Sequence, residues 1–303
     1  MLNSRLRHNL LPPRILIYMK AKRIFSFKLD MRLILLATFF LSLSMVATWL
    51  DKLERDYYGV KPGVMLKDQE MGRLLPAEVH SVVEEMAVRY EKLPVEPTLE
   101  RESGAVIPGR EGRMIDVDHT VERVMAARQG EQIDLILNRV SPKHRTEDLE
   151  MAREHLGEYA TWFHGSAARY TNIKLAAGSI NNIVIWPDEV FSFNEVVGPR
   201  TPERGYLPAP VILQGGGGIQ YGGGVCQVSS TLFNAASKAG IKIIERHQHT
   251  KPVSYVPKGK DATVSYDDLD LKFINDRSGP VTIKSGIANG KIWAQINGRN
   301  EEN

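Results

Sequence analysis

The chain has 303 residues, of which 43% are apolar and 25% are charged, and its formal net charge is +3. This apolar content excludes a largely disordered chain. The small net charge lacks the strong basic excess of a nucleic-acid-binding protein, so no nucleic acid partner is expected. The length fits one membrane anchor and about two domains, at roughly 100–200 residues per domain.

The chain begins with a basic segment followed by an uncharged apolar segment. Eight Lys and Arg residues precede residue 33, where the only acid is Asp30. Residues 33–50 carry no charge, and eighteen helical residues rise about 27 Å, which is enough to cross a hydrocarbon core. Positive charge before the apolar segment places residues 1–32 in the cytoplasm, as a basic tail. We therefore predict a single-pass protein of the cell membrane with extracellular C-terminal domains.

A cleaved signal peptide is the alternative for residues 33–50. The segment is long for the apolar part of a signal peptide, and no clear A-x-A cleavage site follows it. Residues 45–47 are a weak candidate site. Met19 and Met31 are alternative start residues, so whether the anchor is cleaved and where translation starts both stay open.

Residues 57–145 are predicted to form a small α+β domain. Apolar residues recur at three- and four-residue spacing in 77–92, which indicates a helix. Residues 93–108 alternate and contain proline, as strands joined by a turn do. A second helix is predicted at 116–129, with Asp116 or Asp118 as N-cap and Gly130 just past its end. Residues 132–140 alternate as a strand.

Residues 157–298 are predicted to form a second domain of mixed α/β type. Helices are expected at 146–159, 169–181 and 226–238, the last of which carries the only cysteine. Strand-like segments follow at 241–245, 252–256, 262–266, 271–275, 280–287 and 291–296. The predicted fold class is thus α+β, with a transmembrane helix, a small α+β domain, and a domain in which the Cys-bearing helix packs on an antiparallel-rich sheet.

The single cysteine, Cys226, follows a glycine-rich segment and begins a predicted helix. Seven glycines occupy 215–218 and 222–224, where they permit positive φ and close backbone approach. Free N–H groups at a helix start favour an anion. A bound phosphate is poorly supported, because neither a P-loop nor a dinucleotide fingerprint is present. A thiolate fits better, because a helix N-terminus lowers the pKa of a cysteine.

A nucleophilic cysteine needs a base and a group that orients the base. His247 and His249 are candidate bases, and on a strand both would face one side; His247 is slightly preferred. Asp261 is the candidate orienting group, ahead of Asp267. Gln220 lies six residues before Cys226 and is a candidate oxyanion donor. Candidate substrate-binding residues are Gly222, Gly223, Gly224, Gln227, Phe193 and Asn194.

Other roles are open for each of these residues. Cys226 could be a buried core residue, and the histidines could hold the turn at Pro252. A His-x-His metal site lacks an evident third ligand, so neither a metal nor a cofactor is predicted. The glycine-rich segment could be a mobile surface lid.

Five segments of the second domain resemble the VanW family. They are RYTNIKLAAGSIN, DEVFSFNEVVGPRTPERGY, GGGVCQVSSTLFNAASKAG, IIERHQHTKPVSYVPKGKDATV and DLKFIN, and the resemblance covers residues 157–298. One departure is Asp188, where the family usually has glycine. Residues 60–140, with AVIPGREGRMIDVD, resemble more loosely the peptidoglycan-binding module often found before VanW domains.

The resemblance implies an extracytoplasmic cell-wall protein of a Gram-positive bacterium, with peptidoglycan stem peptides as partner and a role in envelope maintenance or the glycopeptide (vancomycin) response. Some VanW-domain proteins are regarded as L,D-transpeptidases, for which the cysteine matching Cys226 would be the nucleophile. The usual transpeptidase motif, with a histidine just before the cysteine, is missing here, so the chemistry would be convergent. The alternative is a non-catalytic peptidoglycan-binding or scaffold protein. The oligomeric state stays open.

Overall fold

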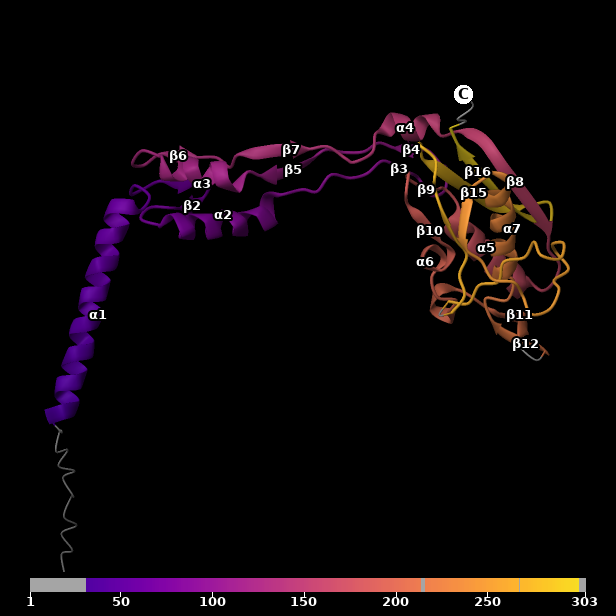
Figure 1. The fold of residues 1–303 in the computed structure, drawn as a ribbon, viewed down its shortest axis with the longest axis horizontal. Helices are drawn as coiled ribbons and strands as arrows, with labels where there is room; N and C mark the ends of the chain where they lie inside the picture. Colours follow the sequence, from indigo (N-terminus) through magenta and orange to yellow (C-terminus); the bar gives the residue numbers. More distant parts are fainter. Residues whose placement is uncertain (1–30, 214–215, 267, 300–303) are drawn as a thin grey trace, which may run out of the picture.

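The computed structural model describes residues 31–213, 216–266 and 268–299 (Figure 1). Most of the predicted basic tail, residues 1–30, lies outside the described residues, as do Gly215 and Asp267. The described chain mixes helices and strands and begins with one long apolar helix, which confirms these general features of the predicted fold class.

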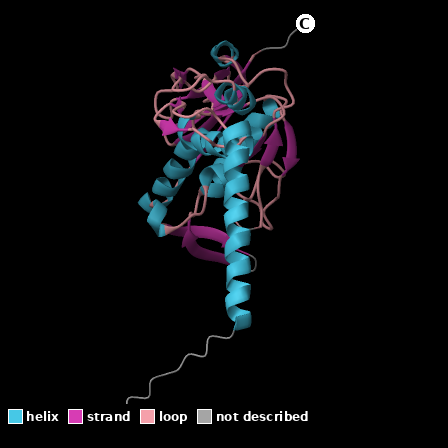
Figure 2. Cartoon of the chain, turned by 90° about the vertical axis from the view of Figure 1, so that its left-hand side faces the viewer, coloured by secondary structure: helices cyan, strands magenta, loops and turns pink. Residues whose placement is uncertain are grey.

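The apolar helix α1 spans Met31–Tyr58 and has no buried residue. Among the described helices it is long and apolar enough to cross a membrane. Figures 1 and 2 show α1 projecting from the end of the N-terminal unit. Near its end, Arg55 holds the carboxylate of Glu78 with Nη1–Oε2 and Nη2–Oε1 distances of 2.6 and 2.8 Å, which ties α1 to the next helix.

The N-terminal unit contains two helices and several short strands. Helix α2, Pro76–Tyr90, packs against α3, Val117–Met125, which begins where the Asp116 side chain accepts the His119 N–H. The strands are β1 Met65–Leu66, β2 Gln69–Glu70, β3 Thr98–Leu99, β4 Val106–Ile107, β5 Gly112–Ile115, β6 Gln132–Ile133 and β7 Leu137–Val140. The predicted strand 132–140 is therefore two strands, because β6 pairs with β1 and β7 pairs with β5.

The C-terminal domain is built on an antiparallel sheet of order β8-β16-β15-β9 (Figure 1). Two helices, α5 Ala167–Ile180 and α7 Val225–Lys238, pack on this sheet. A second sheet has the order β10-β14-β13, and β11 and β12 form a hairpin. The strands are β8 Glu154–Trp162, β9 Ile183–Ile185, β10 Val190–Ser192, β11 Pro208–Leu213, β12 Gly216–Tyr221, β13 Lys242–Glu245, β14 Lys272–Ile274, β15 Val281–Ala288 and β16 Lys291–Gly298; the short helices are α4 Thr146–Met151, α6 Phe193–Val197 and the 3-10 helix η1 Pro202–Arg204.

Helix α7 lies at the centre of this domain. Eleven of its fourteen residues are buried, including polar residues that a surface helix would expose. The hydroxyls of Thr231 and Thr161 on β8 are 2.9 Å apart, and Asn234 donates to the Lys260 carbonyl at 2.6 Å. These bonds satisfy buried polar groups and fix α7 against both the sheet and the loop after β13.

Two sequence expectations are wrong. The predicted helix 146–159 ends at Met151, and 154–162 is strand β8, which pairs along β16. Gly157 weakens a helix there, and a Cβ at this residue would lie 2.6 Å from the Ala239 nitrogen after α7. The predicted strands 252–256 and 262–266 are loops, with only isolated bridges such as His247–Thr263 in the second.

Replacing Phe273 by alanine is expected to destabilise the C-terminal domain by about 3–5 kcal/mol. Phe273 lies on the central strand of the second sheet, is fully buried, and stacks on Phe191 with ring centroids 4.6 Å apart. Urea unfolding followed by the fluorescence of Trp186 and Trp293 would measure the change. Ile219→Ala removes a 73% exposed side chain and should change stability by less than about 0.5 kcal/mol. Equal effects of the two variants would contradict this prediction.

Candidate active site at Cys226

Cys226 is the second residue of α7, and its thiol is half-buried. The residue before the helix, Gly224, has φ 109°, and the N–H groups of Val225 and Gln227 donate to the carbonyls of Gly222 and Gly224, both at 3.0 Å. The Cys226 Sγ lies 3.7 Å from the Thr263 hydroxyl and 3.5 Å from the Val264 carbonyl. The thiol therefore lies between the start of a helix and the loop 262–264.

The glycines before Cys226 form the turn that starts α7. Gly222 also has positive φ, at 82°, and a Cβ on Gly223 would lie 2.6 Å from the Ala209 carbonyl oxygen of β11. Asn172 of α5 donates from its amide to the Gly223 carbonyl at 3.1 Å. Glycine is thus required at this turn for geometry alone, and the predicted substrate-binding role of Gly222, Gly223 and Gly224 stays a prediction.

His249 is the histidine that the fold brings to the thiol. The His249 imidazole and the Cys226 thiol shift each other's pKa, His249 lowering that of the thiol and Cys226 raising that of the imidazole, while His249 Nδ1 lies 2.7 Å from Asp261 Oδ2. The same carboxylate oxygen accepts the His249 backbone N–H at 2.7 Å, and Asp261 Oδ1 lies 3.4 Å from Nη2 of Arg246. Because Nδ1 is held by Asp261, the other ring nitrogen, Nε2, remains for the thiol. Both side chains are almost fully buried, with 7% and 10% exposure.

The three groups shift one another toward their charged forms. Burial is the largest single influence and raises the pKa of Cys226, but His249, Val264 and Thr263 together lower it below the ordinary value. Burial lowers the pKa of His249, but the thiol and Asp261 raise it overall. Burial raises the pKa of Asp261, but the His249 backbone and ring lower it overall. The arrangement therefore favours a thiolate, an imidazolium and a carboxylate together.

His247 occupies a different environment, although the sequence favours it slightly. Strand β13 ends at Glu245, so His247 and His249 do not share a strand face. The His247 Nε2 lies 3.0 Å from Glu245 Oε1, and its side chain is 38% exposed. The geometry thus associates His249, and not His247, with Cys226.

The remaining predicted residues have other surroundings. Gln220 is exposed on β12, where it pairs with Ala209 of β11, and its predicted role as an oxyanion donor stays a prediction. Gln227 is buried, and its amide nitrogen donates to the Thr161 hydroxyl and the Trp162 carbonyl at 3.0 and 2.7 Å. Phe193 has no exposed surface and lies in the core, and its predicted substrate-binding role stays a prediction.

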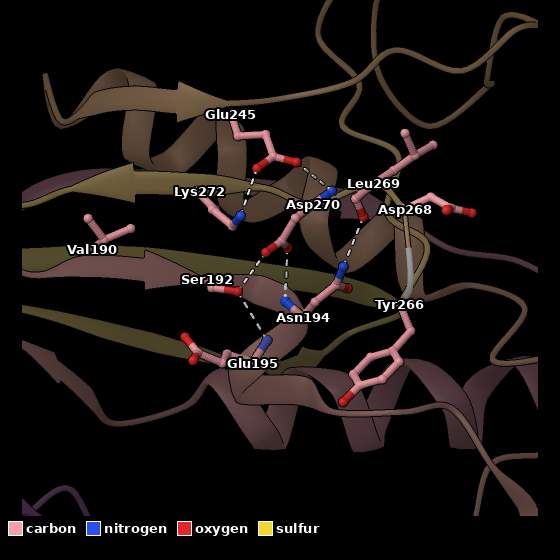
Figure 3. A pocket seen from close by; sticks show the side chains of 10 residues that line it. All are labelled: Val190, Ser192, Asn194, Glu195, Glu245, Tyr266, Asp268, Leu269, Asp270 and Lys272. Atoms are coloured by element: carbon pink, nitrogen blue, oxygen red, sulfur yellow. Dashed lines mark hydrogen bonds and ion pairs between the residues drawn. The ribbon is translucent and has the colours of Figure 1, made fainter.

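Asn194 lines a polar cavity of about 550 Å³ (Figure 3). Its amide nitrogen donates to the Leu269 carbonyl at 2.9 Å, and its Oδ1 accepts from Arg200 at 2.7 Å. Figure 3 also shows Asp270 held by Ser192 and the Asn194 N–H, at 2.6 and 2.9 Å. These bonds hold the loop before β14. No group of three or more His, Cys, Asp or Glu in the described part of the chain has a metal-binding arrangement.

The sequence analysis did not identify three residues that lie near Cys226 in the fold: Ser230, Tyr255 and Arg169. Ser230 donates to the Cys226 carbonyl at 2.7 Å and accepts the Ala262 N–H at 2.8 Å, which joins α7 to the loop that carries Asp261. Tyr255 lies edge-on to His249, with centroids 6.5 Å apart, and burial raises the pKa of its hydroxyl. Arg169 of α5 donates to Gln227 Oε1 at 2.8 Å. Only the adjacent serines after Cys226 gave a local signal, as polar residues within a helix otherwise rich in apolar ones.

The fold and site together define a mixed α/β domain with a Cys–His–Asp constellation at the start of a buried helix. A thiol, an imidazole that lowers the pKa of the thiol, and a carboxylate that orients the imidazole are the three parts of a thiol nucleophile with its base. Placement at a helix N-terminus adds to the lowering of the thiol pKa.

Comparison with known proteins identifies the family of this domain. Residues 168–297 match the family model described as VanW like protein. The chain is 41% identical over 194 residues to the Bacillus subtilis (strain 168) protein named Uncharacterized protein YoaR, which covers 62% of this chain and 64% of YoaR. It is 34% identical over 130 residues to the Vancomycin B-type resistance protein VanW of Enterococcus faecalis (strain ATCC 700802 / V583), which covers 41% of this chain and 47% of that protein.

The protein is a member of the VanW family through its C-terminal domain. The matches span less than two thirds of the length of each of these relatives. No solved structure matches the chain.

Proposed function

We propose that this chain is a membrane-anchored, extracytoplasmic cell-wall protein whose C-terminal domain carries out cysteine-dependent acyl transfer on peptidoglycan stem peptides. The observation that carries the proposal is the position of Cys226 at the start of α7 against Thr263 and Val264, on the loop that begins with Asp261, the carboxylate that holds His249. Two features support the cell-wall setting: the apolar helix α1, and the similarity to a protein named for vancomycin resistance. The N-terminal unit, residues 57–145, would bind peptidoglycan and hold the domain on the wall.

In the first step the Cys226 thiolate attacks a carbonyl carbon of the donor stem peptide, and a C–S bond forms. The negative charge passes to the carbonyl oxygen. Backbone N–H groups at the start of α7 would stabilise it. Val225 and Gln227 already donate within the turn, so among the described bonds at residues 225–227 the Cys226 N–H is the one left for this role. The His249 imidazolium gives its proton to the departing amine as the C–N bond breaks, which leaves a thioester.

In the second step an amine of a neighbouring stem peptide attacks the thioester carbonyl. His249 takes a proton from this amine, a new C–N bond forms, and the C–S bond breaks to return the thiolate. Asp261 keeps the imidazole in the orientation that both transfers need. Water in place of the amine would make the same site a peptidase.

A comparison of wild-type and Cys226→Ala full-length protein tests this function. Each is incubated in detergent with purified muropeptides, and intact-protein and product mass spectra are recorded. We expect a thioester adduct and cross-linked or trimmed products with the wild type, and neither with the variant. If both proteins bind muropeptides equally well and neither gives an adduct or product, a wall-binding or scaffold function replaces acyl transfer.

A further inference from the structure

A cleft of about 470 Å³ adjoins the Cys226 site. Gln227, the residue after Cys226, lines it, as does Tyr255, whose ring lies edge-on to His249. Trp162, His164 and Ser166 lie at the same cleft. The cleft therefore lies beside the Cys226 site, because it is bounded by an immediate neighbour of Cys226 and an immediate neighbour of His249.

Arg169 lies at this cleft and has no carboxylate partner among the residues that the structure describes. Its guanidinium donates to the neutral side-chain oxygen of Gln227 at 2.8 Å, and no Asp or Glu among the described residues lies within ion-pair distance of it. The residues lining the cleft include no acid. A guanidinium has five N–H donors in one plane, so most of its hydrogen-bonding capacity is available to a ligand.

The surroundings of Arg169 hold the guanidinium in place before any ligand binds. The Gln227 amide nitrogen is fixed by Thr161 and Trp162, which orients its oxygen toward Arg169. Gly224 leaves room for the arginine, because a Cβ there would lie 3.1 Å from Arg169 Cγ. The side chain is half-buried, and this burial lowers the pKa of the guanidinium. A desolvated, pre-oriented guanidinium binds a carboxylate through paired hydrogen bonds.

We propose that this cleft is a carboxylate-binding subsite, in which Arg169 holds a free carboxylate of the donor peptide that forms the thioester with Cys226. The substrate class is thereby narrowed to peptides with a carboxylate near the reacting carbonyl, either at the chain end or on a side chain. The inference rests on the proposed function, because it assigns a specificity to the same site.

A second role for Arg169 leads to a different result. If the guanidinium served only to stabilise the Cys226 thiolate, Arg169→Gln would slow alkylation of the thiol at low pH. It would have no effect on the preference between a carboxylate and its amide. Binding to a protein without the thiol separates these two roles.

Isothermal titration of the full-length Cys226→Ala protein in detergent provides the test. Three synthetic stem tetrapeptides serve as probes: one with its carboxylates free, one amidated at the C-terminus, and one amidated on the side-chain carboxyl. We expect one of the two amides to bind at least tenfold more weakly than the free acid, which identifies the source of the carboxylate. Adding Arg169→Gln to the Cys226→Ala protein should weaken binding of the free-acid peptide to the affinity measured for that amide.

Lys291→Gln is the matched control, because this substitution also removes one positive charge next to the cleft. Lys291 Nζ lies 4.5 Å from the centroid of the Trp162 ring, which lines the cleft. The Lys291→Gln variant should preserve the preference for the acid. Equal binding of all three peptides by the Cys226→Ala protein would overturn the carboxylate subsite alone, and so would an Arg169→Gln variant that keeps the preference. Failure to bind any of the peptides would overturn the proposed function together with the subsite.

Discussion

Replacing His249 by glutamine is expected to move the alkylation of Cys226 to higher pH and to lower product formation by about 10²–10⁴-fold. His249 contributes most to lowering the pKa of Cys226 against the effect of burial, with smaller contributions from Val264 and Thr263. Without the imidazole, the effect of burial is opposed only by Val264 and Thr263, so the pKa of the thiol rises. The thiolate would then form at higher pH than in the wild type.

The measurement is simple because Cys226 is the only cysteine of the chain. The rate of iodoacetamide incorporation, followed by intact-protein mass spectrometry between about pH 5 and 10, reports on one thiol. His247→Gln is the matched control, since His247 pairs with Glu245 and not with the thiol. We expect the control to keep the wild-type profile. A shift in the His247 variant, or none in the His249 variant, would reverse the assignment of the base.

The sequence predicted the parts of the site that depend on local pattern. The helices at 169–181 and 226–238 correspond to α5 and α7 within two residues at each end, because the sequence signals for them lie within the segments or directly beside them. The position of Cys226 at a helix start follows from the glycines before it. These features need no knowledge of distant contacts.

The choice between the two histidines depends on contacts that the sequence does not contain. Alternation around Gln248 places both on one face only if β13 continues, and it ends at Glu245. Arg246 then donates to the carbonyls of Asp261 and Gly259, at 2.6 and 2.9 Å, and the chain follows the loop that carries Asp261. The bonds of Arg246 to this loop place the His249 ring next to the Asp261 carboxylate.

Arg169 and Tyr255 show the same limit. Arg169 comes from a different helix, and Tyr255 comes from a segment that the sequence suggested was a strand but that is a loop. Strand β8 was mistaken for a helix because its partner β16 lies at the other end of the chain. Each of these positions depends on contacts between segments that are distant in the sequence.

Replacing Asp261 by asparagine is expected to destabilise the C-terminal domain by about 3–5 kcal/mol near neutral pH and to raise the pKa of the Cys226 thiol. The Asp261 carboxylate accepts the ring and backbone N–H groups of His249 and pairs with Arg246. All three groups are largely buried, and removing one partner of a buried charged network leaves the others uncompensated. The His249 ring would also lose the partner that orients it and raises its pKa, which weakens its effect on the thiol.

The pH dependence of this destabilisation follows from the two shifts. The pKa of Asp261 is lowered in the fold, so its contribution to stability is present above its unfolded pKa and is lost as pH falls through the folded value. The pKa of His249 is raised, so its contribution is full below its unfolded pKa and is lost as pH rises through the folded value. The variant should therefore differ most from the wild type between these two pKa values, and least at strongly acidic pH.

Urea unfolding of both proteins across pH 3–9, read by the C-terminal tryptophans, gives the two stability curves. Asp268→Asn is the matched control, because Asp268 is exposed and should contribute less than about 0.5 kcal/mol at any pH in this range. If the two curves ran parallel through the acidic range, the lowered pKa of Asp261 would not contribute to stability. The carboxylate would then orient His249 without holding the fold together, and the thiol profile alone would report its role.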